Sequence, residues 1–498
     1  MKFLGLRLDE HDSNVTYSDG VNVRYLKPER YNQIKHFGYD NLTDWVFSQY
    51  LLNYKIDELD AICIVLDTHR HPNIKRDKDK LYQTVNIPNA PFDSIKCPVY
   101  IIDHHYAHAL SSWMLIDKSD IDFVLDGFGD FFKSVSIYKN QNIIKNYTID
   151  EVYSFGLWLG RAGDFLQIGG HPDDVAGKLM ALKSYGEVNN TILKELNKYE
   201  YEDARSIFNL EQFQKAYGNE SVYKYNFINI VTTIHEYIEN AMPKFFAKYA
   251  KPEEIITYSG GVAHNVCINT KLKKKFPNLI IPPHCGDEGL SLGCVEFLRQ
   301  LFEQPKFNND NFPFWQTDYC PKTKPSLQQI KKTAEDLANG KIIGWYQGHG
   351  EVGPRALGNR SILMSPEVRN GKDIINQKVK HREEYRPFAA SILKEDTQKF
   401  FDWDTESKFM KYSVKFKDKI FEPISHIDKT SRIQTVNDNH ELFYSLLFEF
   451  KKLTGIPMLL NTSLNDNQKP IAGHPNDALN LLKNSELDKL IIGDKEYK

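Results

Sequence analysis

The 498-residue chain lacks several signatures that identify common classes of protein. Its six cysteines form no C-x-x-C pair, which argues against a zinc ribbon and against a disulfide framework. No window approaches 18 uncharged apolar residues, and the first residues contain no apolar signal-peptide core, so we expect a cytoplasmic protein with no membrane partner. The sequence G-x-x-x-x-G-K-[ST] is absent, which excludes a P-loop enzyme.

An excess of charge of one sign is also absent, since 63 Lys and Arg stand against 66 Asp and Glu, a net charge of -3. This balance neither demands nor excludes a polyanionic partner. Basic runs at 69–76 and 271–275 are interpreted as solvated surface. Hydrophobic residues make up 41% and aromatic residues 13% of the chain, enough for sizeable cores in two to four domains.

One stretch without periodicity, residues 303–326, contains four prolines. We place the domain boundary there, with domains at 1–310 and 326–498 and a linker at 311–325. The second domain is expected to begin with a helix over 326–338 and a strand over 342–346.

Three histidines in five positions follow the apolar run 99–102, which predicts a buried strand ending at Asp103. Small and apolar residues come next and favour a helix, on which His104 and His108 share one face. Two neutral imidazoles on one face can chelate a divalent metal, which needs further carboxylate or water ligands. His105 points elsewhere. The alternative is a set of polar residues near a helix start with one core histidine.

Several turns that follow predicted strands carry polar groups suited to a ligand. His11 and Asp12 lie in the first hairpin, and D-G-x-G-D at 126–130 places two carboxylates beside glycines. Both stretches also suit plain turns with local hydrogen bonds. Lys178 lies in an apolar stretch, where it either binds an anion or snorkels to the surface.

Residues 254–265 predict a strand, a glycine pair and a helix start, which together form a ready anion or nucleotide site. Asp287, in a turn between a predicted strand and helix, is a candidate for the carboxylate that the metal needs.

The second domain is rich in Arg and Lys at predicted strand ends. Gly348-x-Gly350-x-x-Gly353 matches the dinucleotide fingerprint, but Pro354 follows it and no acidic ribose-binding strand comes later, so we reject it. Arg355 and Arg360 in the same loop suit a phosphate or a carboxylate. The cations at 378–386, together with Arg432, suit a triphosphate and a second small anion.

Taken together, these motifs resemble the O-carbamoyltransferases, which include nodulation-factor and tobramycin-type enzymes. The resemblance runs from near residue 3 to near residue 493 and rests on His11-Asp12-Ser13, DHHYAHA at 103–109, SGGVAHN at 259–265, GDEG at 286–289, GPRALGNRSIL at 353–363, REEYRPFAAS at 382–391 and NTSLN at 461–465. It implies an α/β fold with an actin–hexokinase-like N-terminal domain, similar to the threonylcarbamoyladenosine transferase, and a YrdC-like C-terminal domain.

The resemblance also implies a chemistry in two steps. Carbamoyl phosphate and ATP, accompanied by Mg2+, would give carbamoyladenylate in the C-terminal domain with release of pyrophosphate and phosphate. The N-terminal domain would then transfer the carbamoyl group to an acceptor hydroxyl and release AMP. A divalent metal, with Fe(II) expected, would hold the nucleotide and polarise the carbamoyl carbonyl.

Site residues carry over from the family motifs by position. The metal ligands would be His104, His108, Asp126 and Asp287. The catalytic candidates are His11, expected to take the acceptor proton, with Asp12 and Lys178. The nucleotide and carbamoyl phosphate would contact Lys178, Asp126, Gly127, Gly260, Gly261, Asn265, Arg355, Arg360, Lys380, Arg382, Arg386, Arg432, Thr462, Ser463 and Asn465.

The chain departs from the family pattern at several positions. His349 stands where Arg is usual, Leu464 replaces Phe, and residues 467–469 replace Arg-Gly-Glu. The C-terminal departures bear on nucleotide binding, and the unusual segment 160–174 bears on the acceptor.

Two acceptors stand as alternatives, the hydroxyl of a small-molecule sugar or antibiotic and the hydroxymethyl group of 5-hydroxymethylcytosine in DNA. A composition rich in Lys, Asn and Ile, the 160–174 segment and the basic run at 69–76 favour DNA slightly. A threonylcarbamoyl-type tRNA-modifying enzyme is the alternative function, against which GPRALGNRS argues. The presence of all the expected ligands disfavours an inactive regulator. The oligomeric state stays open, with a homodimer as one alternative.

Overall fold

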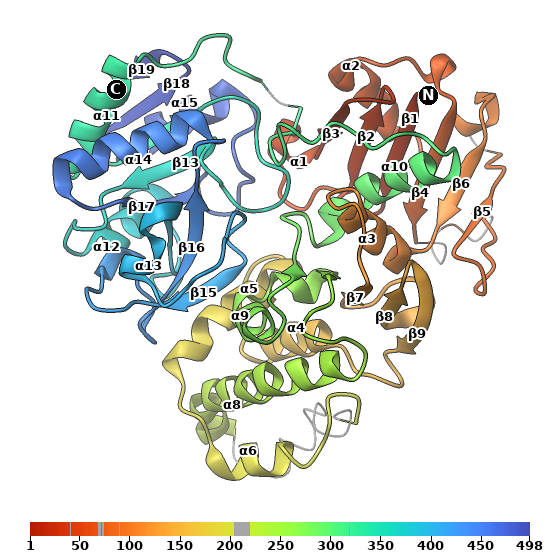
Figure 1. The fold of residues 1–498 in the computed structure, drawn as a ribbon, viewed down its shortest axis with the longest axis horizontal. Coiled ribbons are helices and arrows are strands. Elements are labelled where there is room, and N and C mark those ends of the chain that lie inside the picture. Colours follow the sequence, from red (N-terminus) through yellow and green to blue (C-terminus); the bar gives the residue numbers. More distant parts are fainter. Residues whose placement is uncertain (40, 68–70, 72–73, 89, 204–219, 318) are drawn as a thin grey trace. The chain divides into compact units, whose positions relative to one another are not determined.

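A computed structural model describes residues 1–39, 41–67, 71, 74–88, 90–203, 220–317 and 319–498 (Figure 1). The chain forms two compact units, the first from residues 1–28 and 36–311 and the second from residues 29–35 and 312–498. Both units combine helices with a β-sheet, so the predicted α/β class is confirmed. No described helix is both long and apolar enough to cross a membrane.

The first unit contains two sheets of six and five strands. The strands of the first sheet are β1 (Phe3–Leu8), β2 (Asn14–Ser18), β3 (Val23–Leu26), β4 (Ala61–Leu66), β5 (Tyr82–Thr84) and β6 (Val99–Ile102). The strands of the second are β7 (Ile121–Leu125), β8 (Lys133–Lys139), β9 (Asn142–Thr148), β10 (Ile256–Ser259) and β11 (Leu279–Ile280).

The two sheets repeat one topology. In the first, β1 pairs with antiparallel β2 and parallel β4, and the order is β3-β2-β1-β4-β6-β5. In the second, β7 pairs with antiparallel β8 and parallel β10, and the order is β11-β10-β7-β8-β9. The central strands β1, β4 and β7 are buried along their whole length, because a sheet covered on both faces requires continuous apolar runs.

The first unit also contains helices, which connect the strands of these two sheets. They are α2 (Ser48–Leu52), α3 (His104–Trp113), α4 (Phe155–Phe165), α5 (Pro172–Leu182), α6 (Asn190–Leu196), α8 (Glu220–Ala247), α9 (Val266–Lys275) and α10 (Leu290–Leu301). Helix α10 contacts β1, β2 and β4, helix α3 contacts β7, β8 and β10, and the two helices contact each other. Helix α3 therefore links the two sheets at the turns that carry the predicted ligands.

The second unit is built on one eight-stranded sheet in the order β15-β16-β14-β17-β13-β12-β18-β19. Its strands are β12 (Ile343–Tyr346), β13 (Arg360–Met364), β14 (Ala389–Leu393), β15 (Tyr412–Lys415), β16 (Thr430–Val436), β17 (Met458–Ser463), β18 (Lys489–Ile492) and β19 (Lys495–Tyr497). Its helices are α1 (Glu29–Asn32), α11 (Leu327–Ala338), α12 (Gly371–Ile375), α13 (Thr397–Phe400), α14 (Glu441–Thr454) and α15 (Pro475–Asn484).

One short segment of the N-terminal part belongs to the second unit. Within residues 29–35, Arg30 is 2% exposed and its Nη2 donates to the carbonyl of Gly353 at 2.9 Å. An added Cβ on Gly473 would lie 2.1 Å from the carbonyl oxygen of Arg30. Burial and close backbone approach thus fix this segment, which has no counterpart in the division predicted from the sequence.

Candidate functional site

Four predicted metal ligands come together in the first unit. Helix α3 begins directly after β6 because Asp103 caps it, accepting a hydrogen bond from the Tyr106 amide at 3.1 Å. His104 and His108 lie one turn apart on this helix, Asp126 follows β7, and Asp287 precedes α10. One donor atom from each lies within 4.8 Å of the others.

The distances between these donor atoms suit one metal ion. The Asp126 Oδ2 lies 2.9 Å from His108 Nε2 and 3.2 Å from His104 Nε2. Both Nε2 atoms lie 3.4 Å from Asp287 Oδ1 and 3.2 Å from each other. Ligand atoms bound about 2.1 Å from an ion at right angles are about 3 Å apart. Two imidazoles and two carboxylates fit a divalent transition metal such as Zn, Fe or Mn.

Charges of both signs compensate each other in this cluster. Burial lowers the pKa of His104, but Asp287 and Asp126 outweigh burial and raise the pKa to about 10. Burial raises the pKa of Asp126, but His104 and His108 hold it well below its usual range. Arg7 donates to Asp287 Oδ2 at 2.9 Å and also pairs with Asp9.

Backbone amides orient the second oxygen of Asp126. Its Oδ1 accepts from the Gly127 amide at 2.7 Å and from the Gly261 amide at 3.1 Å. Gly260 has φ 90°, and a Cβ there would lie 2.2 Å from the Leu125 carbonyl oxygen. The glycine pair therefore allows the turn after β10 to approach the end of β7. A Cβ on Gly127 would meet nothing within 4 Å, so there is open space beside Asp126.

The hairpin that carries His11 and Asp12 is attached to the metal-ligand turn. Arg7, before the turn, contacts Asp287 Oδ2, and Asn14, after it, donates to the Asp287 carbonyl at 2.9 Å. Asp12 is buried and accepts from Lys27 Nζ at 2.7 Å. His11 Nδ1 lies 3.3 Å from Asp12 Oδ2, and the His11 side chain is 39% exposed.

Two further residues predicted to cradle the nucleotide have local contacts. The Asn265 Oδ1 caps α9, accepting from the Cys267 and Ile268 amides at 3.1 and 3.2 Å. Lys178, on α5, is 7% exposed and its Nζ donates to the Gly169 carbonyl.

The second unit brings the predicted motifs around Lys380 and Asn465 together. Lys380 is 2% exposed, and its Nζ donates to the Ser463 carbonyl at 2.8 Å and to the Asn465 Oδ1 at 2.6 Å. Thr462 lies opposite Ile362 where β17 pairs with β13. The pKa of Lys380 lies well below its usual value. Burial is the largest cause, and the positive charges of Arg382 and Arg386 lower the pKa further.

Four arginines near Lys380 form the cation cluster, which consists of Arg355, Arg382, Arg386 and Arg432. Burial, followed by Arg386, lowers the pKa of Arg382 to about 9. Burial, followed by Arg355 and Arg382, lowers the pKa of Arg432 well below its usual value. Among the described residues, Arg382 Nη2 and Arg432 Nε are buried without a hydrogen-bond partner. Mutually repelling, incompletely bonded guanidinium groups are suited to phosphate or carboxylate ligands.

Arg360, also predicted to bind ligand, lies outside this cluster. It is 0% exposed, and its guanidinium donates to the carbonyls of Gln347 at 2.6 Å and of Tyr319 and Gly348 at 3.0 Å. It also lies over the Tyr346 ring at 3.6 Å. These contacts hold the Arg360 side chain inside the unit, and its expected contact with a ligand stays a prediction.

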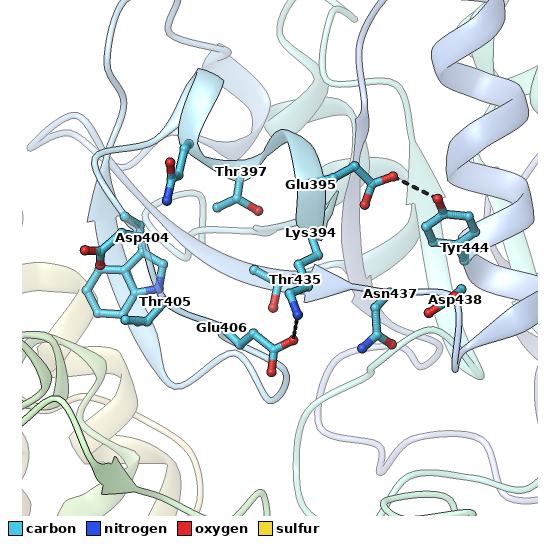
Figure 2. Close-up of a pocket in the computed structure, with 12 residues that line it drawn as sticks. Lys394, Glu395, Thr397, Asp404, Thr405, Glu406, Thr435, Asn437, Asp438 and Tyr444 are labelled. Carbon is cyan, nitrogen blue, oxygen red and sulfur yellow. Dashed lines mark hydrogen bonds and ion pairs between the residues drawn. The ribbon is translucent and has the colours of Figure 1, made fainter.

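A pocket of about 560 Å³ in the second unit contains none of the predicted site residues (Figure 2). Lys394 pairs with Glu406 at 2.5 Å, and Tyr444 donates to Glu395 at 2.8 Å, as the dashed lines show. Of the two basic runs, half of 69–76 lies outside the described residues. Arg76, in the described half, has a side chain only 1% exposed and pairs with Asp103 at 3.1 Å and with Asp130, so it is not the solvated surface that we expected. The other run ends α9, where Lys273 donates to the Pro277 and Leu279 carbonyls.

Several residues that shape the site were missed from the sequence. Arg7 had one usable signal, a charge inside an otherwise apolar strand. Lys27 and His36 contact Asp12 from a distant segment and had no local signal. Glu351 Oε1 accepts from the amides of Leu357 at 2.7 Å and Asn359 at 2.9 Å, and so shapes the loop after Arg355.

Comparison with known proteins agrees with these motifs. Family models described as carbamoyltransferase N-terminus and carbamoyltransferase C-terminus match residues 93–295 and 334–498. Nodulation protein NolNO of Sinorhizobium fredii is 27% identical over 97% of this chain and 78% of that protein. The 3'-hydroxymethylcephem-O-carbamoyltransferase of Amycolatopsis lactamdurans is 28% identical over 76% of each chain. The solved structure of T. kodakarensis HypF covers 61% of this chain and 48% of its own, with 14% identity and a TM-score of 0.39.

Proposed function

Because the chain belongs to the carbamoyltransferase family and is a transferase, we propose that it is an ATP-dependent O-carbamoyltransferase. The second unit would form carbamoyladenylate from ATP and carbamoyl phosphate. The first unit would transfer the carbamoyl group to an acceptor hydroxyl. We also propose an actin–hexokinase-like fold for the first unit, supported by its repeated topology, and a YrdC-like fold for the second.

The convergence of His104, His108, Asp126 and Asp287 carries this proposal. These residues would hold a divalent metal, for which we propose Fe(II). When bound, the metal supplies Lewis-acid polarisation of a carbonyl oxygen. Asp126 is oriented for this task by two amides, and Arg7 orients Asp287.

In the first unit, His11 would take the proton of the acceptor hydroxyl. His11 lies on a turn whose two ends contact Asp287 through Arg7 and Asn14. The Asp12 carboxylate accepts from Nδ1 of His11. With Nδ1–H directed at Asp12, Nε2 is the nitrogen that can take a proton. The acceptor O–H bond breaks, the oxygen bonds to the carbamoyl carbon, and AMP leaves with the bonding electron pair.

The cation cluster of the second unit would bind the phosphates of Mg2+–ATP and of carbamoyl phosphate. Its positive charge would stabilise the phosphoryl oxygens during the first step, in which one water is consumed and pyrophosphate and phosphate are released. Lys380, Ser463 and Asn465, which are joined by hydrogen bonds, would form one side of this site.

For the acceptor we propose a hydroxymethyl group. The name of the cephem relative specifies a 3'-hydroxymethyl acceptor, and 5-hydroxymethylcytosine in DNA presents the same chemistry on another unsaturated ring. A small molecule and DNA are therefore the two candidate acceptors to be compared. The tRNA-modifying alternative has no support among the matched relatives named above.

Radiolabelled carbamoyl phosphate and ATP test the proposal. The acceptors are a 3-hydroxymethyl cephem, free sugars, aminoglycosides and duplex DNA containing 5-hydroxymethylcytosine. We expect label on one acceptor, with AMP formed in equal amount. Label on DNA should weaken steeply with salt, because phosphate contacts release counterions. No label on any acceptor, and no AMP in any reaction, would refute the transferase proposal.

A further inference from the structure

A second buried group of charges surrounds the Asp12 carboxylate, apart from the metal ligands. Lys27 Nζ lies 2.7 Å from Asp12 Oδ1, and His36 Nδ1 lies 3.0 Å from Asp12 Oδ2. His11 Nδ1 lies 3.3 Å from the same Oδ2. Three potential donors thus converge on one carboxylate, and one of them is the proposed proton acceptor.

His36 also faces a carboxylate on its other side. Its Nε2 lies 3.5 Å from Asp174 Oδ1, at the start of α5, and its ring stacks on His171 with centroids 4.4 Å apart. Only the imidazolium form carries N–H groups on both ring nitrogens. An imidazolium is therefore the form of His36 that is attracted to Asp12 and Asp174 together.

The backbone holds this arrangement in place. The Ser13 amide donates to the Phe37 carbonyl at 3.0 Å, and the Tyr39 amide donates to Ser13 Oγ at 3.0 Å. Asp12 has φ 52°, a left-handed conformation that Asp tolerates better than most residues. The hairpin turn and the segment after His36 are thus fixed to each other independently of the side-chain ion pairs.

We propose that His36 is a positioning residue that ties Asp174 on α5 to the Asp12–His11 pair and so holds His11 for proton transfer. The inference rests on the proposed function. It assigns a role to the unusual segment 160–174, whose end reaches the catalytic hairpin through His171 and Asp174. His36 itself would not touch the reacting atoms.

Charge supports this assignment. Burial lowers the pKa of His36, but Asp12 and Asp174 outweigh burial and raise the pKa to about 9. Burial raises the pKa of Asp12, but Lys27, His11 and His36 hold it well below its usual range. A protonated His36 therefore shares the field of Asp12 with Lys27. Without that charge, Asp12 would favour the protonated, inactive form of His11 more strongly.

The test uses His36→Gln and His36→Lys in the full chain. The probe is whichever acceptor wild type labels, a 3-hydroxymethyl cephem, a free sugar, an aminoglycoside or duplex DNA containing 5-hydroxymethylcytosine. We expect kcat for transfer to fall about tenfold in His36→Gln. The acid limb of its pH–rate profile should move up by about half a pH unit. His36→Lys should keep the wild-type limb. Pyrophosphate formation from ATP and carbamoyl phosphate should stay unchanged in both variants.

Two further variants guard the interpretation. Asp174→Asn should lower kcat in the same direction by less, and Glu58→Gln, which removes an exposed ion pair with Lys2, should change nothing. An unchanged kcat and acid limb in both His36→Gln and Asp174→Asn would overturn the inference alone. An equal loss of transfer and pyrophosphate formation would also overturn it. Wild type that labels no acceptor of the panel and forms no AMP would overturn the inference together with the proposed function.

Discussion

The two proposed sites of this chain treat charge in opposite ways. In the first unit, carboxylate oxygens of Asp126 and Asp287 lie 2.9 to 3.4 Å from the Nε2 atoms of two histidines. Each charge therefore has a partner of the opposite sign. In the second unit, cations accumulate, and the pKa values of Arg382, Arg432 and Lys380 are lowered. The comparison indicates what each site is built to take. Converging donors suit a cation, and neighbouring guanidinium groups suit an anion.

The largest effect is expected where the metal-ligand set is broken. His108→Ala removes one of four donors, so we expect less than one tenth of the wild-type bound metal and transfer slower by about 1000-fold. Pyrophosphate formation in the second unit should persist. Metal content by mass spectrometry and label transfer measure the two effects.

A neighbouring histidine provides the matched control. His105 is buried on the same helix, but its Nδ1 contacts Ser136 Oγ at 2.8 Å and it is not among the four donors. His105→Gln should retain the metal. Full metal occupancy in His108→Ala, or equal metal loss in His105→Gln, would contradict the assignment of ligands.

Arg360→Gln should lower the free energy of unfolding by about 2–4 kcal/mol. The substitution leaves buried carbonyls of Gln347, Tyr319 and Gly348 without their charged donor. Urea denaturation, monitored by fluorescence, measures the change. An Arg360→Gln variant that keeps its stability but loses pyrophosphate formation would instead support the predicted contact between Arg360 and the ligand.

Much of the architecture was accessible from the sequence, for physical reasons that particular strands show. β6 and β12 are continuous apolar runs, and the strands predicted over 99–102 and 342–346 fall within one residue of the observed ones. Strands β16, β18 and β19 were not predicted. They lie in stretches where charged residues interrupt the apolar pattern, and pairing with neighbouring strands determines them.

The candidate site divides in the same way. The four metal-ligand candidates that the family resemblance implies, His104, His108, Asp126 and Asp287, do lie together, because strand ends bring turns from distant segments to one place. Arg360 lies five residues after Arg355 in the same motif, yet its side chain is fully buried. Sequence patterns name residue types suited to a ligand, but the direction of a side chain depends on packing across the sheet.

Arg432→Gln should separate function from stability in the cation cluster. None of the ion pairs formed by the described residues includes Arg432, so its removal relieves repulsion and should raise the free energy of unfolding by about 1 kcal/mol. Pyrophosphate formation should fall about 30-fold, because anion binding loses a charged donor. Lower stability together with unchanged activity would contradict the proposed role of this cluster.

The smallest effect is a pH-dependent contribution of His36 to stability. Its pKa is raised from 6.5 to about 9 in the folded chain, so its stabilisation is complete below the unfolded value and is lost as pH rises through 9. Wild type should exceed His36→Gln in unfolding free energy by about 1–2 kcal/mol more at pH 6.5 than at pH 10. Urea titrations at the two pH values measure this difference. A difference that grows with pH would mean that His36 is buried in its neutral form, and Asp12 would then depend on Lys27 alone for compensation.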